Sequence, residues 1–129
     1  MTIRNLMLAG LLTAGLAACA SADMAPAKTG NTALGPVLVD AKGMTLYTFD
    51  KDATPGKSAC NGPCAQNWPP LMAAGDAKAS GDWSVITRDD GSKQWAYKGK
   101  PLYAWVKDTK PGDTTGDGFL NGAWHIAKP

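Results

Sequence analysis

A seven-residue pattern occurs twice in this chain, and it limits the possible folds more than any other feature. LYTFDKD at residues 46–52 and LYAWVKD at residues 102–108 start 56 residues apart and share Leu-Tyr-x-aromatic-x-x-Asp. Residues 42–68 and 98–124 align without a gap, and the identical pairs include Lys42/Lys98, Gly43/Gly99, Pro55/Pro111, Gly56/Gly112 and Trp68/Trp124. Two copies with so long a period predict two paired halves of one domain and not a solenoid.

Each copy has the pattern of short β-strands separated by turns. Candidate strands, bounded by the turn signals Asp-Ala-Lys-Gly, Asp-Asp-Gly-Ser and Lys-Gly-Lys, occur at residues 36–39, 44–49, 84–88, 93–97, 101–106 and 123–127. The chain has 15 Gly and 9 Pro, and all 11 acidic residues are Asp, which favours turns over helix interiors. We therefore predict a mainly β fold. It is a small antiparallel β-domain over residues 36–129, built from two related β-repeat units at about 36–72 and 84–129.

Side chains alternate along a strand, so the motif has two faces. Tyr47 and Phe49 share one face and Leu46 points to the other, and the second copy repeats this with Tyr103, Trp105 and Leu102. If both faces are buried, the strand is central; if one is open, an aromatic strip lies on the surface. The sequence leaves both alternatives open, although core packing is the more common use of aromatic residues.

The Asp of each motif copy follows the strand and precedes Pro-Gly. We expect Asp52 and Asp108 to cap these turns, because carboxylate oxygens accept backbone N–H bonds there. A hydrogen bond from a motif Tyr to a motif Asp is a related structural possibility. Ligand binding by Asp52 or Asp108 is the less favoured alternative.

The N-terminus has the pattern of an export signal. Arg4 precedes an apolar run that is too short to span a bilayer, and the run ends in Leu-Ala-Ala-Cys at Cys19. This pattern predicts a lipoprotein signal peptide at residues 1–18, acyl chains such as palmitate on Cys19, and a flexible tether at 19–35. Ordinary cleavage after Ala22 is the alternative. Ala20, rather than Asp, after the Cys favours the outer membrane, facing the periplasm.

These features together resemble a bacterial secreted-repeat lipoprotein family defined by a Tyr-x4-Asp repeat, Yx(FWY)xxD. The two copies here are Tyr47-Phe49-Asp52 and Tyr103-Trp105-Asp108, and SACNGPCAQNWPPL and DTTGDGFLNGAWHIA also fit the family pattern. The resemblance covers roughly the whole chain after the signal. It implies an exported protein of uncharacterised function and supplies no catalytic residues.

Two further cysteines lie four residues apart, in Cys60-Asn-Gly-Pro-Cys64. A turn brings such positions close enough for a disulfide, and export places them in an oxidising compartment. We expect a structural disulfide between Cys60 and Cys64. Metal binding and thiol redox chemistry are the alternatives, but thiol oxidoreductases space their cysteines by two residues within a βαβ unit.

Other candidate sites have weaker support. Pro-Gly-Lys-Ser at residues 55–58 lacks the earlier glycine of a P-loop, because position 51 is Lys. The run 113–118 resembles a calcium loop, but Trp124 stands where the bidentate Glu would be. A copper site could combine His125, the single histidine, with Met44, Met72 and the thiols.

The sequence therefore favours a non-enzymatic role, with no catalytic residue, cofactor or metal assigned. A formal net charge of +2 is too small to indicate nucleic-acid binding. We expect a membrane-anchored binding or interaction module of the cell envelope, whose partner is an envelope protein or a small apolar ligand. A small-ligand carrier, for a hydrocarbon or for copper, and a thiol-redox accessory are the alternatives.

Overall fold

The computed structural model describes residues 25–129. The proposed signal peptide, Cys19 and the first part of the tether lie outside the described residues. Within 25–129, no helix is both long enough and apolar enough to cross a bilayer.

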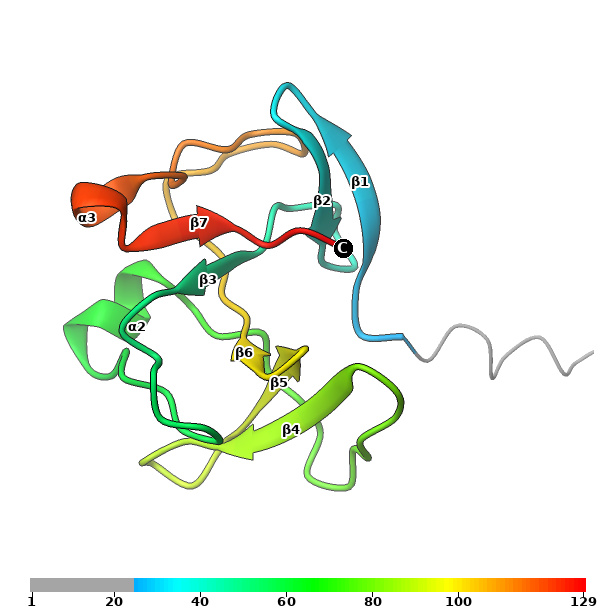
Figure 1. The fold of residues 1–129 in the computed structure, drawn as a ribbon, viewed down its shortest axis with the longest axis vertical. Helices are drawn as coiled ribbons and strands as arrows, with labels where there is room; N and C mark the ends of the chain where they lie inside the picture. Colours follow the sequence, from blue (N-terminus) through cyan, green and yellow to red (C-terminus); the bar gives the residue numbers. More distant parts are fainter. Residues whose placement is uncertain (1–24) are drawn as a thin grey trace, which may run out of the picture.

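Residues 25–129 form three small antiparallel sheets and two short helices (Figure 1). The first sheet pairs β1 (Lys28–Thr32) with β2 (Gly35–Val39). The second pairs β3 (Tyr47–Phe49) with β7 (Trp124–Ile126). The third contains β4 (Trp83–Thr87), β5 (Lys93–Tyr97) and β6 (Lys100–Pro101). The predicted mainly β, antiparallel fold with two repeat units is confirmed.

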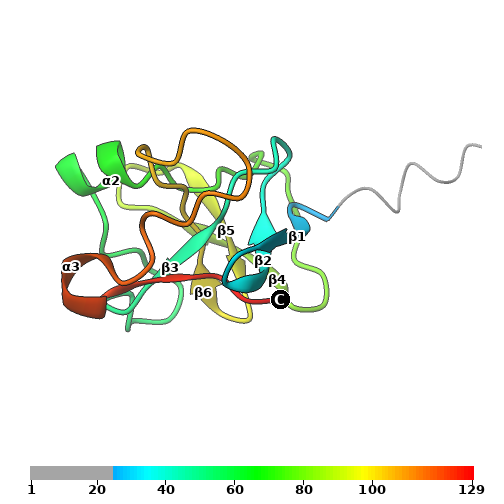
Figure 2. The same cartoon turned by 90° about the horizontal axis from the view of Figure 1, so that it is seen from above.

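The helices α2 (Pro63–Asn67) and α3 (Phe119–Gly122) lie toward the same end of the molecule in both views (Figures 1 and 2). They occupy matching places in the two repeats, each between a motif loop and the repeated Trp. Pro63 begins α2, where its missing N–H costs nothing. In α3, Leu120 and Asn121 have positive φ, so this segment is a pair of tight turns more than a regular helix.

The two repeats exchange strands. β3 belongs to the first repeat and β7 to the second, and they pair with Tyr47 opposite Ile126 and Phe49 opposite Trp124. Tyr47 and Tyr103 also form an isolated antiparallel bridge, donating a backbone N–H to each other's carbonyl at 2.8 and 3.0 Å. The centre of the domain is therefore built equally from both halves, as a pseudo-twofold arrangement.

Both faces of the motif strand are buried, which resolves the question left open by the sequence. The aromatic face packs into one core cluster around Tyr47, Tyr103 and Trp124. Leu46 and Leu102 lie in a second cluster on the opposite face, and neither is exposed to solvent. The motif strand is central, and its aromatic strip is core.

The predicted tether at residues 19–35 is too long. Lys28–Thr32 form β1 instead, in full register with β2 across a turn at Ala33 and Leu34. Thr32 stabilises that turn, because its Oγ1 accepts the Leu34 N–H and donates to the Gly35 carbonyl. None of the β1 residues is buried. Its sequence, Lys-Thr-Gly-Asn-Thr, therefore lacks the alternation of apolar and polar residues that marks a strand. The domain therefore begins before residue 36.

Candidate functional site

The repeated Tyr and Asp residues form two hydrogen bonds that cross between the halves, one buried and one partly buried. The Tyr47 hydroxyl donates to Asp108 Oδ2 at 2.6 Å, and the Tyr103 hydroxyl donates to Asp52 Oδ2, also at 2.6 Å. Each Tyr thus bonds the Asp of the other copy. The expected Tyr–Asp bond is present, but sequence spacing could not show the exchange, since both copies offer the same two residues.

The second oxygen of each motif Asp has the expected capping role. Asp52 Oδ1 accepts the Ala59 N–H at 2.6 Å. Asp108 Oδ1 accepts the N–H and the hydroxyl of Thr115 at 3.0 and 2.6 Å. Ala59 and Thr115 are themselves repeat equivalents, 56 residues apart. Each carboxylate therefore closes the Pro-Gly loop of its own repeat while it binds the tyrosine of the other.

Four aromatic rings stack through the core with the same pseudo-twofold symmetry. Trp68 and Trp124 lie at its centre, with ring centroids 3.7 Å apart and planes inclined by 3°. Phe49 stacks on Trp124 at 4.1 Å, and its equivalent Trp105 stacks on Trp68 at 4.0 Å. The aromatic position of the motif thus supplies the two ends of a continuous stack and is not free to bind a ligand.

The hydroxyls of the two motif tyrosines have strongly raised pKa values. Burial, followed by the bond to a carboxylate, raises the pKa of both Tyr47 and Tyr103 far above the ordinary value of 10.0. Burial also raises the pKa of Asp52, against the lowering effects of Tyr103, the Ala59 N–H and Arg88. The tyrosines therefore remain neutral donors at physiological pH, which suits a structural role and not proton transfer.

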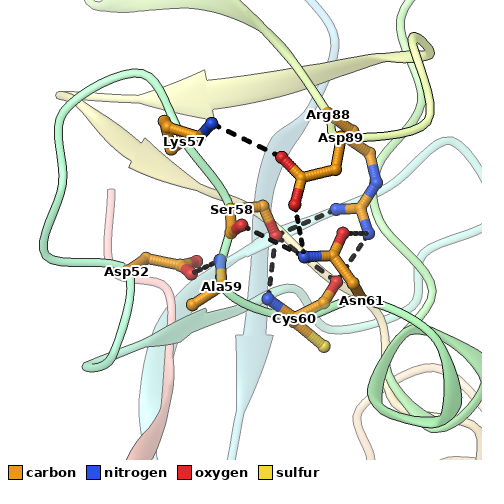
Figure 3. Close-up of polar contacts among 8 residues, drawn as sticks. All are labelled: Asp52, Lys57, Ser58, Ala59, Cys60, Asn61, Arg88 and Asp89. Atoms are coloured by element: carbon orange, nitrogen blue, oxygen red, sulfur yellow. Dashed lines mark hydrogen bonds and ion pairs between the residues drawn. The ribbon is translucent and has the colours of Figure 1, made fainter.

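Cys60 and Cys64 form the predicted disulfide, with their Cα atoms 5.1 Å apart. The loop is further held by Arg88, which comes from the β4–β5 turn and is almost completely buried (Figure 3). Arg88 Nη2 donates to the Cys60 carbonyl at 2.6 Å. Arg88 Nη1 donates to Ser58 Oγ at 3.0 Å and to Gln94 Oε1 at 2.7 Å.

Sequence reasoning did not identify Arg88. A signal was available: outside the first few residues, Arg88 is the single arginine in a chain that otherwise uses lysine. A planar guanidinium can bond several acceptors at once, which lysine cannot. Ser58 extends the network, since its Oγ lies 2.6 Å from the Tyr103 hydroxyl. Arg88 is thus connected to one of the crossed Tyr–Asp pairs and fixes the disulfide loop.

The second repeat replaces the disulfide with a close glycine contact. Gly116 stands at the position of Cys60, and a Cβ there would lie 2.6 Å from the Trp68 ring. Its backbone N–H donates to the Tyr47 hydroxyl at 3.2 Å. The two halves therefore support their tyrosines by different means, and the disulfide is not part of the shared plan.

The residues considered as calcium and copper ligands make other bonds in the structure. The calcium-like run places Asp113 on the Thr109 and Lys110 N–H groups, and Asp117 on the Ile126 N–H. The copper hypothesis loses its thiolates to the disulfide. Within residues 25–129, no cluster of three or more His, Cys or Asp side chains could hold a metal ion.

One surface groove among the described residues is a candidate for binding. It has a volume of about 390 Å³ and lies between the β3–β7 pair and the turn joining β5 to β6. His125, on β7, faces this groove, and its Nε2 lies 2.8 Å from Asp50 Oδ2. The His125 side chain is 47% exposed, so this histidine lies at the surface of β7.

Comparisons with known proteins give one result. No curated protein and no solved structure matches the chain. A family model described as a secreted repeat of unknown function matches residues 28–72 and 84–128. The first match begins at β1, in agreement with the domain boundary seen in the structure. Because the two matches cover most of the chain and coincide with its two halves, the protein belongs to this family of secreted repeats.

Proposed function

We propose that the protein is a non-enzymatic binding or interaction module of the cell envelope, exported and held at a membrane by a lipid on Cys19. The proposal rests on one observation: the residues that define the repeat make their contacts with each other inside the domain. The tyrosine of each half bonds the aspartate of the other half, and the aromatic positions form the buried stack. The motif therefore serves to hold the fold together. Binding is the role of surface residues that differ between the two halves.

The sequence supports the membrane anchor, through the Leu-Ala-Ala-Cys pattern at Cys19 and the Ala20 that follows it. Residues 20–27 then separate a lipid on Cys19 from β1. Such a short connection would hold the domain near the membrane surface, since an extended chain spans about 3.3–3.6 Å per residue. We place the protein in the outer membrane, facing the periplasm.

Replacing Cys19 by Ala tests the anchor. We expect the wild-type chain in the membrane fraction with incorporated labelled palmitate, and the variant without label in the soluble periplasmic fraction. Cys60→Ala serves as the matched control and should remain membrane-bound and labelled. A wild-type chain that is soluble, unlabelled and begins after Ala22 would contradict the anchor and support ordinary signal cleavage.

Native mass spectrometry of the full-length protein, extracted unreduced from the envelope of a producing bacterium, tests the binding role. We expect a mass lower by two hydrogens, for the Cys60–Cys64 disulfide, and a non-covalently bound molecule or protein. Recovery of the chain only as a free monomer, from every preparation, would contradict the proposal. A bound metal with free thiols would instead favour the redox or copper alternative.

A small-ligand carrier is the second candidate, and the groove beside His125 favours it. Its volume of about 390 Å³ lies in the lower part of the usual range for small-molecule sites. A protein partner and a small ligand predict different masses in the same experiment, so one measurement separates the two candidates.

A further inference from the structure

The groove beside His125 combines an apolar floor with a cationic rim. Its floor includes Leu102, Ile126 and Ala127, all buried in the core. Its rim carries the three lysines Lys98, Lys100 and Lys128. An apolar surface next to positive charge is the chemistry that holds an organic anion, with the carbon body on the floor and the charge at the rim.

Charge is concentrated at this place. The three rim lysines face one carboxylate, Asp50, which is paired with His125. Within residues 25–129, none of the three lysines forms an ion pair. The whole chain has only two more basic than acidic residues, 13 against 11. The groove therefore carries an excess of positive charge, whereas the charges of the whole chain nearly balance.

The aromatic wall of the groove helps to place one of these charges. Tyr97 lines the groove, and the Lys98 Nζ lies 5.2 Å from the centroid of its ring. Lys98 itself has a φ of 51°, a left-handed conformation that side chains other than glycine rarely adopt. The β5–β6 turn thus holds this lysine at the rim at some conformational cost.

The duplication provides an internal comparison that separates fold from function. The equivalents of Thr48, Asp50, His125 and Lys128 in the other half are Ala104, Val106, Pro69 and Met72. These four positions are apolar there, and so is Met44, the equivalent of Lys100, whereas the equivalent of Lys98 is Lys42. Val106 and Met72 are nevertheless 47% and 52% exposed, so their positions are also on the surface.

The backbone around both surfaces is the same. The Asp50 N–H donates to the Ala123 carbonyl at 2.8 Å, and its equivalent Val106 donates to Asn67 at 3.1 Å. The Ala127 N–H bonds the Leu46 carbonyl, and its equivalent Leu71 bonds Leu102. Since this backbone forms equally well with apolar side chains, the fold does not require Asp50, His125 or Lys128. Their polarity is a property of this groove alone.

We propose that the groove between the β3–β7 pair and the β5–β6 turn binds a small organic anion with an apolar body, such as an aryl or short-chain carboxylate. Lys98, Lys100 and Lys128 hold the anionic group, and Tyr97, Ile126 and Ala127 contact the carbon body. The inference rests on the proposed function, because it names a ligand class for the binding module.

A titration of the full-length protein with three probes, followed by amide chemical shifts, tests this assignment. Benzoate carries both features, benzamide has the ring without the charge, and inorganic phosphate has charge without the ring. We expect saturable shifts at Lys98, Ile126 and Ala127 with benzoate alone, and an affinity that falls as salt is added. Equal binding of benzamide or of phosphate, or no saturable shift with benzoate, would overturn the proposal.

Two variants with the same net charge provide the matched comparison. Lys98→Gln/Lys128→Gln removes two rim charges, and we expect about tenfold weaker benzoate binding. Lys42→Gln/Lys107→Gln removes two exposed charges elsewhere, one of them the repeat equivalent of Lys98, and should leave binding unchanged. Equal weakening by both variants would show unspecific attraction and overturn the site. A failure of benzoate while a partner still copurifies in the mass experiment removes the ligand class and leaves the binding module.

Discussion

The motif tyrosines are the residues on which the domain depends most. Each has a fully buried ring, shares its backbone N–H and carbonyl with the other tyrosine, and donates its hydroxyl to a carboxylate of the other half. A tyrosine is needed at these positions because phenylalanine would fill the same space but leave a buried carboxylate without its donor. The identical spacing of Tyr and Asp in the two copies is thus explained by contacts between the copies.

We expect Tyr47→Phe and Tyr103→Phe each to lower the free energy of unfolding by about 1–3 kcal/mol. The larger loss should come from Tyr103→Phe, because that hydroxyl also lies 2.6 Å from Ser58 Oγ in the Arg88 network. Urea unfolding measures both. Tyr97→Phe is the control, since its partly exposed ring stays intact, and a loss of the same size there would contradict this account.

Two aspartates should affect the pH dependence of stability with opposite sign. Burial raises the pKa of Asp52 above the ordinary 3.8, so its contribution is present below that value and is lost as pH rises through the folded pKa. Backbone N–H groups of Thr109 and Lys110 lower the pKa of Asp113, so its contribution is present above 3.8 and is lost as pH falls.

Thermal unfolding between about pH 3 and pH 7 measures these contributions through Asp52→Asn and Asp113→Asn. We expect the stability of the wild type relative to Asp52→Asn to decrease as pH rises, and relative to Asp113→Asn to increase. Parallel curves for the two variants would show that the local environments described here do not control the titrations.

At the scale of elements, the two hairpins of the repeats have different turns and different tasks. The β1–β2 hairpin turns through two residues, whereas β4 and β5 are joined by the longer Arg88–Ser92 segment that carries Arg88 into the disulfide loop. The strands β2, β3, β4, β5 and β7 were predictable from apolar runs and turn residues, whereas the strand expected at 101–106 contributes only Pro101 to β6. β1 was not, because its side chains avoid the core, and neither was Arg88, because its acceptors come from distant parts of the chain.

Arg88→Met should lower the free energy of unfolding by about 2–4 kcal/mol, because Ser58, Gln94 and the Cys60 carbonyl lose a charged donor inside the protein. Arg88→Lys should recover only part of this, since lysine cannot reproduce the fork. Lys93→Met on the same hairpin removes an exposed contact to Thr87 and should change stability by less than about 0.5 kcal/mol. Chemical denaturation compares all three, and equal effects of Arg88→Met and Lys93→Met would contradict a buried role for Arg88.

At the scale of the molecule, the two halves share one core. The sequence repeat predicted paired halves, but it could not show that β3 pairs with β7 or that the Tyr–Asp bonds cross, because a repeat alignment compares copies without placing them in space. The groove proposed for binding was also beyond sequence reasoning, since it joins residues 48–50, 97–102 and 125–128. The sequence suggested a Tyr–Asp bond, but not that each tyrosine bonds the aspartate of the other copy.

Neither half should fold alone. A fragment of residues 25–78 lacks Asp108, Trp105 and Trp124, and a fragment of 79–129 lacks Asp52, Phe49 and Trp68. We expect circular dichroism to show each fragment unfolded, and an equimolar mixture to recover a cooperative thermal transition. A cooperative transition from either fragment alone would contradict the shared core.

The crossed Tyr–Asp bonds also have a historical consequence. A single repeat, before duplication, could find the carboxylate for its tyrosine only on a second chain, so we infer that the ancestor of this domain was a symmetric homodimer. Because the present halves have diverged, the test is a single-repeat chain with a consensus of the two copies, which should dimerise; sedimentation as a folded monomer would refute this ancestry. In such an ancestor one gene encoded both copies, so a substitution changed both copies of a surface at once. After fusion each half could change separately, and the differences between Asp50 and Val106 and between Lys128 and Met72 are of this kind.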